Sequence, residues 1–259
     1  MDFLAKALDV ALAAAKEAGR IQMKYYEKGL EAGSKKGNVR DIVTNADMEA
    51  DAAIRGIISE TFPEHTIITE ENTAKKGNEF TWHVDPIDGT TNYARKGKYF
   101  CVSIALAKGD EVLVGVVFNA LNNELYTAIK WKGALLNGKK IEIGKTVAID
   151  RAVICTDLCH ESEKRKPIFE ILAGFTGARS IRIQGSGALT VCEVANGLAD
   201  CYFNICGSSW DFAAAALIIR EAGGVAKSPE GNEWTPQTGK GIIATNQKLY
   251  KEILARVKA

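Results

Sequence analysis

Residues 82–92 read WHVDPIDGTTN, an apolar run that ends in a loop rich in oxygen donors. Asp85 and Asp88 supply two carboxylates to this loop. Pro86 fixes the backbone φ angle between them, and Gly89 permits a tight turn directly afterwards. Such a loop can direct several oxygen ligands at one point, and oxygen is the donor that Mg²⁺ prefers. The same residues are also compatible with an ordinary surface turn, so the choice between the two interpretations depends on the rest of the chain.

Further acidic residues stand at the ends of other predicted elements. The short apolar run 65–69 predicts a strand that is followed by Glu70 and Glu71. Asp47 and Asp211 fall in the first turns of two predicted helices, where acidic residues are common for electrostatic reasons alone. Each position by itself is therefore unremarkable. Taken with the central loop, they form a candidate cluster of ligands for hard cations: Asp47, Glu70, Glu71, Asp85, Asp88 and Asp211.

The first half of the chain combines helical periodicity with alternating strand patterns. Apolar residues at three- and four-residue steps predict a helix over 3–28, with Asp2 as its N-cap and Gly29 as its stop. Thr44-Asn45-Ala46-Asp47 resembles a capping box and predicts the start of a second helix. Apolar runs separated by turns predict strands, most of them in an antiparallel meander, over 65–69, 81–85, 99–107, 112–119 and 124–129, with a hairpin at Asn137-Gly138.

The second half alternates strand and helix patterns, which predicts a parallel or mixed sheet covered by helices. No long linker interrupts the chain. We therefore expect residues 1–150 to form an α+β half that carries the metal site, and residues 151–259 to form an α/β half in the same compact unit. The predicted strands are 152–156, 181–183, 199–204 and segments near 225 and 242, and the predicted helices are 161–173, one from Ser186, 210–222 and one from Gln247.

Composition excludes several classes of function. The chain has 259 residues, of which 46% are hydrophobic, and this is ample for a large core. Its 33 basic and 32 acidic residues give a formal charge of +1, so we expect neither nucleic acid nor membrane as a partner. Charged residues interrupt the first apolar stretch, and no apolar run reaches membrane-spanning length. We therefore expect no signal peptide and a cytoplasmic location.

The six cysteines are expected to be buried free thiols, because a chain of this length does not need a disulfide framework. Cys155, Cys159 and His160 have a spacing that zinc could use. No second cysteine pair at zinc-finger spacing accompanies them, so we do not expect a zinc site.

Three motifs carry a resemblance to a known family. They are 41–47 (DIVTNAD), 82–92, and 210–224, which opens with WDFAAA and closes with EAGG. In order and spacing they resemble the inositol monophosphatase family, a branch of the lithium-sensitive, metal-dependent phosphatases, and the resemblance covers nearly the whole chain. It implies a layered αβαβα sugar-phosphatase fold, with an antiparallel sheet in one half and a mixed or parallel sheet in the other.

The resemblance also implies two or three Mg²⁺ ions with specific ligands. Glu70, Asp85 and the backbone carbonyl of Ile87 would hold the first ion. Asp85, Asp88 and Asp211 would hold the second, and a more weakly bound third ion would sit near Glu70. Every one of these positions carries an oxygen donor, as a hard cation requires.

Catalytic roles follow from the same resemblance. Thr90, hydrogen-bonded to Asp47, would orient or help deprotonate the water that attacks phosphorus, with Glu70 taking part beside the first ion. Glu71 would be a supporting acid rather than a principal ligand. The phosphate would rest on the ions and on backbone amides around Gly89 and Thr90, without any arginine.

The substrate's hydroxyls would meet Asp88, the Gly185-Ser186 turn and Asn204. Gly185-Ser186 also suits the N-cap of the following helix, and the two roles can coexist. Asn204 stands where animal members of the family have a glutamate that accepts hydrogen bonds from inositol. Asparagine lacks the charge that strengthens such a bond, so another polyol phosphate becomes an alternative to inositol 1-phosphate.

Arg95 follows the central loop and is a candidate contact for a second phosphate, together with Lys96 and Lys98. A solvated basic turn is the other interpretation. Fructose 1,6-bisphosphate is therefore the leading alternative substrate, ahead of adenosine 3′,5′-bisphosphate and histidinol phosphate. A non-enzymatic relative is disfavoured because every implied ligand is present, and a homodimer is expected because family members are commonly dimers.

Overall fold

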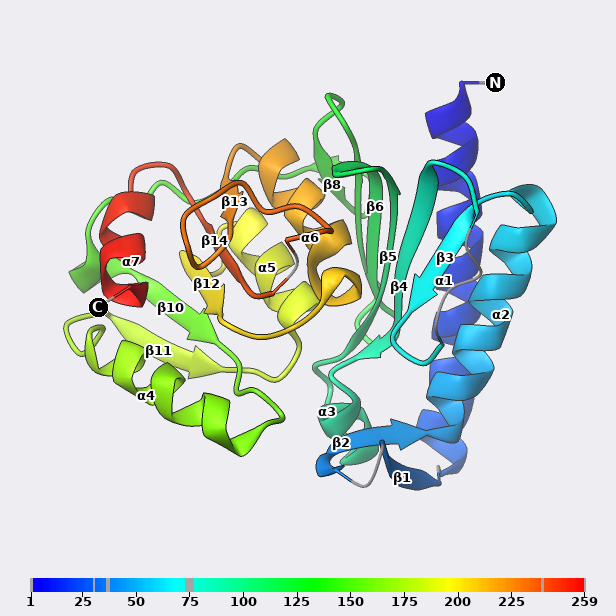
Figure 1. Cartoon of the computed structure of the whole chain (residues 1–259), viewed down its shortest axis with the longest axis horizontal. Coiled ribbons are helices and arrows are strands. Elements are labelled where there is room, and N and C mark those ends of the chain that lie inside the picture. The colour runs from blue at the N-terminus through cyan, green and yellow to red at the C-terminus, as the bar shows by residue number, and fades with distance from the viewer. Residues whose placement is uncertain (1, 30, 36–37, 73–76, 239, 259) are drawn as a thin grey trace.

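The structure is a computed structural model that describes residues 2–29, 31–35, 38–72, 77–238 and 240–258. Its elements stack as helix, sheet, helix, sheet and helix, which confirms the αβαβα layering predicted from the motifs (Figure 1). The outer layer beside the larger sheet holds α1 (Phe3–Lys28) and α2 (Asn45–Thr61). The middle layer holds α5 (Gly187–Ala195) and α6 (Ser209–Glu221), and the far layer holds α4 (Arg165–Ala173) and α7 (Tyr250–Val257).

The larger sheet runs in chain order from β3 to β9. Only its first pair, β3 with β4, is parallel, and the remaining described pairs are antiparallel. The predicted meander is therefore confirmed. Its strands are β3 (Thr66–Thr69), β4 (Phe80–Asp88), β5 (Cys101–Lys108), β6 (Glu111–Asn119), β7 (Glu124–Ile129), β8 (Ala134–Leu136) and β9 (Lys139–Lys140), the last two joined by the predicted Asn137-Gly138 turn.

The smaller sheet has the order β11-β10-β12-β14-β13 and is mixed, as expected. β10 is parallel to both of its neighbours, whereas β14 is antiparallel to β12 and to β13. Its strands are β10 (Val153–Thr156), β11 (Ser180–Ile183), β12 (Cys201–Asn204), β13 (Val225–Lys227) and β14 (Ile242–Thr245). The division of the chain near residue 150 stays a prediction.

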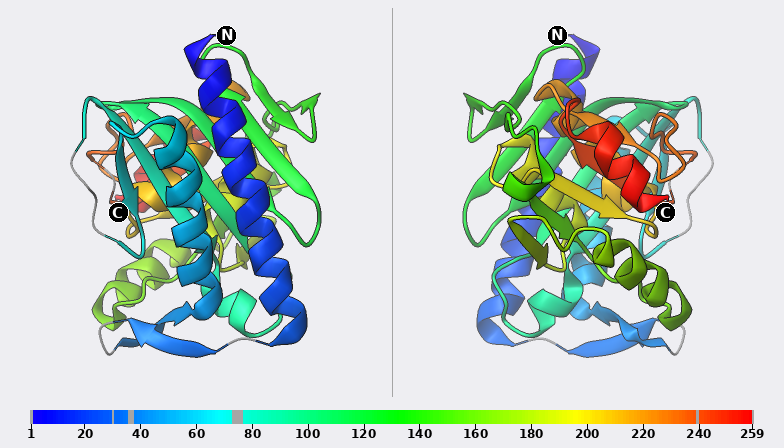
Figure 2. Two further views of the ribbon diagram at one scale, coloured as in Figure 1. Left: turned by 90° about the vertical axis from the view of Figure 1, so that its right-hand side faces the viewer. Right: turned by 90° about the vertical axis from the view of Figure 1, so that its left-hand side faces the viewer.

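The middle helices bring the two sheets into one core. A single cluster of buried residues combines positions on β5 and β6 with most of α5 and α6 and with Tyr202 and Ala244 of the smaller sheet. α6 is buried almost all round, because apolar sheet faces flank it on both sides. On the outer face of the larger sheet, α1 and α2 lie side by side across the strands (Figure 2).

Local capping signals fix the ends of the first two helices. The Asp2 side chain accepts a hydrogen bond from Leu4 N, and Gly29, with φ of 101°, ends α1 as predicted. The predicted capping box of α2 is also present, since Thr44 and Asp47 exchange side-chain and backbone hydrogen bonds. Asp47 is thereby fixed in the first helical turn.

Several elements were not anticipated from the sequence. The hairpin of β1 (Ala32–Lys35) and β2 (Asn38–Thr44) lacks the apolar alternation that would reveal it. The other unanticipated elements are α3 (Thr90–Ala94) and η1 (Ile149–Arg151), whereas η2 (Ser162–Lys164) and α4 together fill the helix predicted over 161–173.

The expectation of six free thiols is wrong for one pair. Cys159 and Cys206 form a disulfide with Cα atoms 5.9 Å apart, because they follow the adjacent parallel strands β10 and β12. The other four cysteines are free and buried, as expected: Cys101, Cys155, Cys192 and Cys201. A search of the described helices finds none that combines the length and the apolar character needed to span a bilayer.

Candidate metal and phosphate site

A bulge in β4 turns Asp85 and Asp88 toward the same side of the sheet. Residues three apart on a regular strand point to opposite faces. Here Asp85 pairs with Ser103 and Asp88 pairs with Cys101, so three steps along β4 match two steps along β5. Ser103 and Cys101 share a face, and the two aspartates opposite them therefore share it as well.

Side chains stabilise the backbone of this bulge. Ile87 N donates to Asp85 Oδ1 at 2.9 Å, and Thr90 Oγ1 donates to Ile87 O, also at 2.9 Å. Pro86 has no N–H to give, and its carbonyl accepts a 2.8 Å hydrogen bond from Gln22 Nε2 on α1. The groups that leave the β4–β5 ladder are thus paired elsewhere, as buried backbone groups require.

Gly89 brings the bulge against the turn before α5. Its φ of +93° suits glycine, and a Cβ atom there would lie 2.9 Å from Tyr99 O and 3.0 Å from Gly185 O. Asn92 secures the same approach, because its Nδ2 donates to Gln184 O at 2.8 Å. The central loop and the Gly185-Ser186 turn, far apart in sequence, therefore form one surface.

The side chain of Asp88, the last residue of β4, lies at the N-terminus of α5. Ser186 stands at the N-cap position but does not cap its own helix with its side chain. Its hydroxyl donates instead to Asp88 Oδ2 at 2.6 Å, and the amides of Gly187 and Ala188 donate to the same carboxylate at 3.3 and 2.8 Å. Burial raises the pKa of Asp88, these hydrogen bonds lower it, and the negative charge of Glu70 raises it further.

Asp47 faces a second group of negative charges. Thr44 N donates to Asp47 Oδ2 at 2.8 Å, and Thr90 Oγ1 lies 3.4 Å from Asp47 Oδ1. Burial raises the pKa of Asp47 to about 7, against the hydrogen bonds from Thr44, and the charges of Glu71 and Glu70 add to the rise. The implied Thr90–Asp47 contact is thus present, although Thr90 is closer to Ile87 O.

Glu70 and Asp211 approach Asp85 from two sides. Glu70 follows β3, and its N–H donates at 3.1 Å to the carbonyl of Val84, which precedes Asp85. Asp211 lies in the first turn of α6, where its Oδ2 accepts a hydrogen bond from the backbone of the N-cap residue. Ser103, the partner of Asp85 in the sheet, donates to Trp210 O at 3.3 Å. The start of α6 therefore packs against the acidic end of β4.

The donor set suits a hard cation. The implied ligands are carboxylates and one carbonyl. Burial chiefly, and neighbouring negative charge to a smaller extent, raise the pKa values of Asp47 and Asp88, and a bound cation would favour their ionised forms. Within the described part of the chain, no three His, Cys, Asp or Glu side chains already surround a common point as ligands do. Asp88 and Asp211 accept hydrogen bonds from backbone amides, and each carboxylate has further lone pairs that could face a cation.

Asp157, which directly follows β10, lies beside the predicted site residues Gly185 and Asn204 but was not itself predicted from the sequence. Its carboxylate accepts hydrogen bonds from Gly185 N at 2.6 Å and from Tyr202 OH at 3.1 Å. Burial raises its pKa to about 7, the Gly185 hydrogen bond opposes this, and the charge of Asp88 adds to it. Asn204 Nδ2 donates to the Asp157 carbonyl at 3.3 Å. The available signal was an acid at the carboxyl end of a predicted parallel strand.

The remaining candidate substrate contacts differ in whether their side chains already bind other groups of the protein. Asn204 is buried and its Oδ1 accepts a hydrogen bond from Cys206 N at 2.6 Å, so its side-chain amide is already hydrogen-bonded within the protein. Arg95 is exposed at the end of α3. The ammonium group of Lys96, by contrast, binds the carbonyl of Tyr26 at the end of α1. Lys96 is therefore no longer a candidate contact for a second phosphate.

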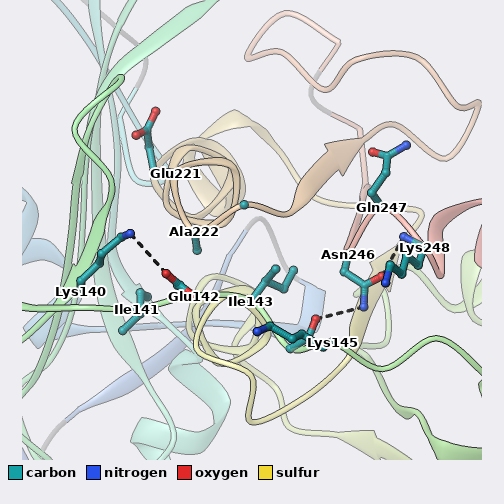
Figure 3. Close-up of a pocket in the computed structure, with 12 residues that line it drawn as sticks. Lys140, Ile141, Glu142, Ile143, Lys145, Glu221, Ala222, Asn246, Gln247 and Lys248 are labelled. Atoms are coloured by element: carbon teal, nitrogen blue, oxygen red, sulfur yellow. Dashed lines mark hydrogen bonds and ion pairs between the residues drawn. The ribbon is translucent and has the colours of Figure 1, made fainter.

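A cavity of about 440 Å³ lies away from these acids, between the segment after β9, the end of α6 and the residues before α7 (Figure 3). None of the predicted site residues lines it. It is bordered by Lys140, Ile141, Glu142, Ile143, Gly144, Lys145, Glu221, Ala222, Gly223, Asn246, Gln247 and Lys248.

Comparison with known proteins places the chain among relatives of the same length. It is 38% identical over 254 residues to "Inositol monophosphatase 2" of Solanum lycopersicum, covering 93% of this chain and 94% of that protein. It is 36% identical over 257 residues to "Nus factor SuhB" of Escherichia coli (strain K12), covering 97% and 95%. Among solved structures, the IMPase of Thermotoga maritima superposes with a TM-score of 0.89 at 30% identity, covering 98% and 97%.

The match to a family description is equally extensive. Residues 4–259 match the model described as "Inositol monophosphatase family". That span contains the bulged β4, the first turn of α6 and the start of α5. The chain belongs to the inositol monophosphatase family.

Proposed function

We propose that this chain is a Mg²⁺-dependent phosphatase that hydrolyses the monoester of a small polyol or sugar, with inositol 1-phosphate as its substrate. One observation carries the proposal. The bulge in β4 places Asp85 and Asp88 on one face, beside Glu70 and the start of α6. Cations held by these carboxylates would lie beside a phosphate bound at the adjoining Gly89 loop.

The proposed metal ligands divide into two sets that share one residue. Glu70, Asp85 and the carbonyl of Ile87 would hold one Mg²⁺, and Asp85, Asp88 and Asp211 would hold another. When bound, Mg²⁺ supplies charge to stabilise the transferring phosphoryl group and promotes ionisation of water. Asp85 bridges the two sets, so its loss should affect both.

Thr90 and Asp47 are the proposed proton acceptors. In this scheme Thr90 Oγ1 takes a proton from the attacking water and passes its own hydroxyl proton to Asp47 Oδ1, which lies 3.4 Å away. Backbone amides around Gly89 and Thr90 would hold the phosphate oxygens, since amide groups in a tight loop can bind anions without a cationic side chain.

The proposed substrate hydroxyls lie beyond the phosphate, along a continuous polar wall. It begins at Gly89, where an added Cβ atom would lie 3.0 Å from Gly185 O, and passes through the Gly185 amide to the carboxylate of Asp157. Tyr202 and Asn204 continue it. Because Asn204 is neutral, we propose that Asp157, whose carboxyl is ionised above a pKa of about 7, is the charged acceptor for substrate hydroxyls, while Ser186 acts through Asp88.

The experiment that tests the proposal is a phosphate-release panel. Purified protein is given Mg²⁺ and, in turn, inositol 1-phosphate, fructose 1,6-bisphosphate, adenosine 3′,5′-bisphosphate, histidinol phosphate and glycerol 2-phosphate. We expect turnover of inositol 1-phosphate that depends on Mg²⁺, falls when Ca²⁺ replaces it and is inhibited by Li⁺. Unchanged turnover in excess EDTA, or turnover of none of the five, would overturn the proposal.

Fructose 1,6-bisphosphate is the second candidate, favoured by the exposed Arg95 after the phosphate loop. If Arg95 binds a second phosphate, Arg95→Ala should lower kcat/KM for the bisphosphate more than for inositol 1-phosphate. Equal losses would show that Arg95 belongs to an ordinary basic turn. We further propose a cytoplasmic homodimer, which size-exclusion chromatography with light scattering can check.

A further inference from the structure

Gln22 is a buried polar residue on the otherwise apolar inner face of α1. Its relative exposure is 0%, and its neighbours in the helix, Ala18 and Ile21, belong to the hydrophobic core. Gln22 Nε2 donates to Pro86 O at 2.8 Å, whereas Gln22 Oε1 has no hydrogen-bond partner among the described residues. The amide thus pairs a buried carbonyl of the metal loop while its own oxygen stays unpaired, although an unpaired buried acceptor is unfavourable. The amide therefore serves something other than packing.

The hydrogen bond from Gln22 reaches the metal loop through one peptide group. Pro86 O and Ile87 N belong to the same planar unit, whose two ends cannot turn independently. Gln22 holds the oxygen end, and the N–H end donates to Asp85 Oδ1 at 2.9 Å. A rotation of this peptide would break both hydrogen bonds at once. The orientation of the Asp85 carboxylate is thus coupled to the hydrogen bond from Gln22.

The same peptide has no support from the sheet. In the pairing of β4 with β5, Asp85 and Asp88 have partner residues, whereas Pro86 and Ile87, in the bulge between them, have none. Without Gln22, the Pro86 carbonyl would be a buried acceptor with no ladder partner, free to seek another orientation. The following carbonyl, Ile87 O, is fixed on its other side by Thr90. Gln22 and Thr90 therefore hold the two ends of the loop segment that carries the proposed ligands.

We propose that Gln22 is a positioning residue of the metal site: through the Pro86–Ile87 peptide it orients the Asp85 carboxylate and the Ile87 carbonyl toward Mg²⁺. Residues that orient metal ligands without touching the ion commonly change metal affinity by about 10–100-fold when removed. The inference rests on the proposed function only in requiring that these ligands bind Mg²⁺. It assigns a role in metal binding to an α1 side chain outside every motif of the sequence.

Titration calorimetry with Mg²⁺ alone, on full-length protein freed of metal, tests the inference. Gln22→Met keeps the volume and removes the donor. It should weaken Mg²⁺ binding by about tenfold, while the melting temperature in EDTA changes little, because removal of the unpaired Gln22 Oε1 offsets the loss of the hydrogen bond to Pro86 O. A purely structural role predicts the opposite pattern, with a lower melting temperature and unchanged affinity. Ile21→Val, one position away and equally buried, is the matched control and should lower the melting temperature without changing Mg²⁺ affinity.

The outcomes separate this inference from the proposed function. If the native chain binds Mg²⁺ and releases phosphate but Gln22→Met binds Mg²⁺ equally well, the role of Gln22 is overturned and the enzyme assignment stands. If the native chain binds no Mg²⁺, both fail together. If Gln22→Met does not fold, the amide is required for folding and the positioning role is overturned. Gln22→Asn, which keeps the amide but is too short to reach Pro86 O, should weaken Mg²⁺ binding as Gln22→Met does.

Discussion

The Thr90 hydroxyl has one proton and two acceptors within reach. It lies 2.9 Å from Ile87 O and 3.4 Å from Asp47 Oδ1. The shorter contact stabilises the bulge, and the longer one is the proposed proton path. A threonine at this position therefore has a structural and a chemical role, which substitution can separate.

Thr90→Ala should lower kcat by about 10²–10³-fold, because a positioned proton acceptor is lost. Mg²⁺ half-saturation should change by about tenfold at most, because Thr90 positions the Ile87 carbonyl but is not itself a proposed ligand. Thr90→Ser keeps the hydroxyl and should retain most of the activity. Steady-state kinetics at several Mg²⁺ concentrations give both quantities. A variant that lost Mg²⁺ binding but kept kcat would show that Thr90 acts on the ligands and not on water.

At the scale of elements, the sequence predicts what local patterns control. The bounds of α1, the capping box of α2 and the meander follow from periodicity and turn residues, and the structure confirms them. The apolar run predicts a strand over 81–85, yet β4 continues to Asp88 through a bulge, a place in a strand where proline such as Pro86 is tolerated. Partner strands create that bulge, so no local pattern could reveal it.

Long-range pairing explains the other differences within the site. Ser186 has the sequence of an N-cap, but its hydroxyl binds Asp88, which comes from the other sheet. Asp157 has no surrounding motif, and the pairing of β10 with β11 and with β12 brings it to Gly185 and to Tyr202. In each case the hydrogen-bond partner lies far away in the sequence, so the spacing of residues along the chain does not predict the contact.

The disulfide joins the loops that follow β10 and β12. Cys159 and Cys206 are separated by 47 positions, and closing a loop of that length stabilises a folded chain by about 2–4 kcal/mol. We expect reductant to lower the melting temperature of the native protein. The Cys159→Ser/Cys206→Ser double variant should start at the lower temperature and show no response to reductant. A native protein whose melting temperature ignores reductant, with both thiols open to alkylation, would contradict the bridge.

Across the whole molecule, buried acids link stability to pH. Burial raises the pKa of Asp47 and of Asp157 to about 7 from a usual value of 3.8. Between these values the folded chain binds more protons than the unfolded chain, so each group's contribution to stability is complete below pH 3.8 and is lost as the pH rises through 7. In EDTA we therefore expect the melting temperature to fall between pH 5 and pH 8.

Asp157→Asn isolates one contribution to this effect. Asparagine can accept the Gly185 hydrogen bond and donate to Tyr202, so the contacts survive while the titration disappears. The decrease in melting temperature from pH 5 to pH 8 should be smaller in this variant than in the native protein. Saturating Mg²⁺ should reduce the decrease in both, because Mg²⁺ competes with protons for the neighbouring carboxylates. Identical pH profiles in the two proteins would show that Asp157 ionises normally.

The central claim is that the carboxylates gathered by the β4 bulge bind Mg²⁺ and thereby drive phosphate release. The most direct measurement is the rate of phosphate release from inositol 1-phosphate at saturating Mg²⁺ in Asp85→Asn, with Asp110→Asn, an exposed turn aspartate, as the control. The account predicts a folded Asp85→Asn protein whose turnover is reduced by about a thousandfold, and a control with native turnover. Near-native turnover in Asp85→Asn would contradict it.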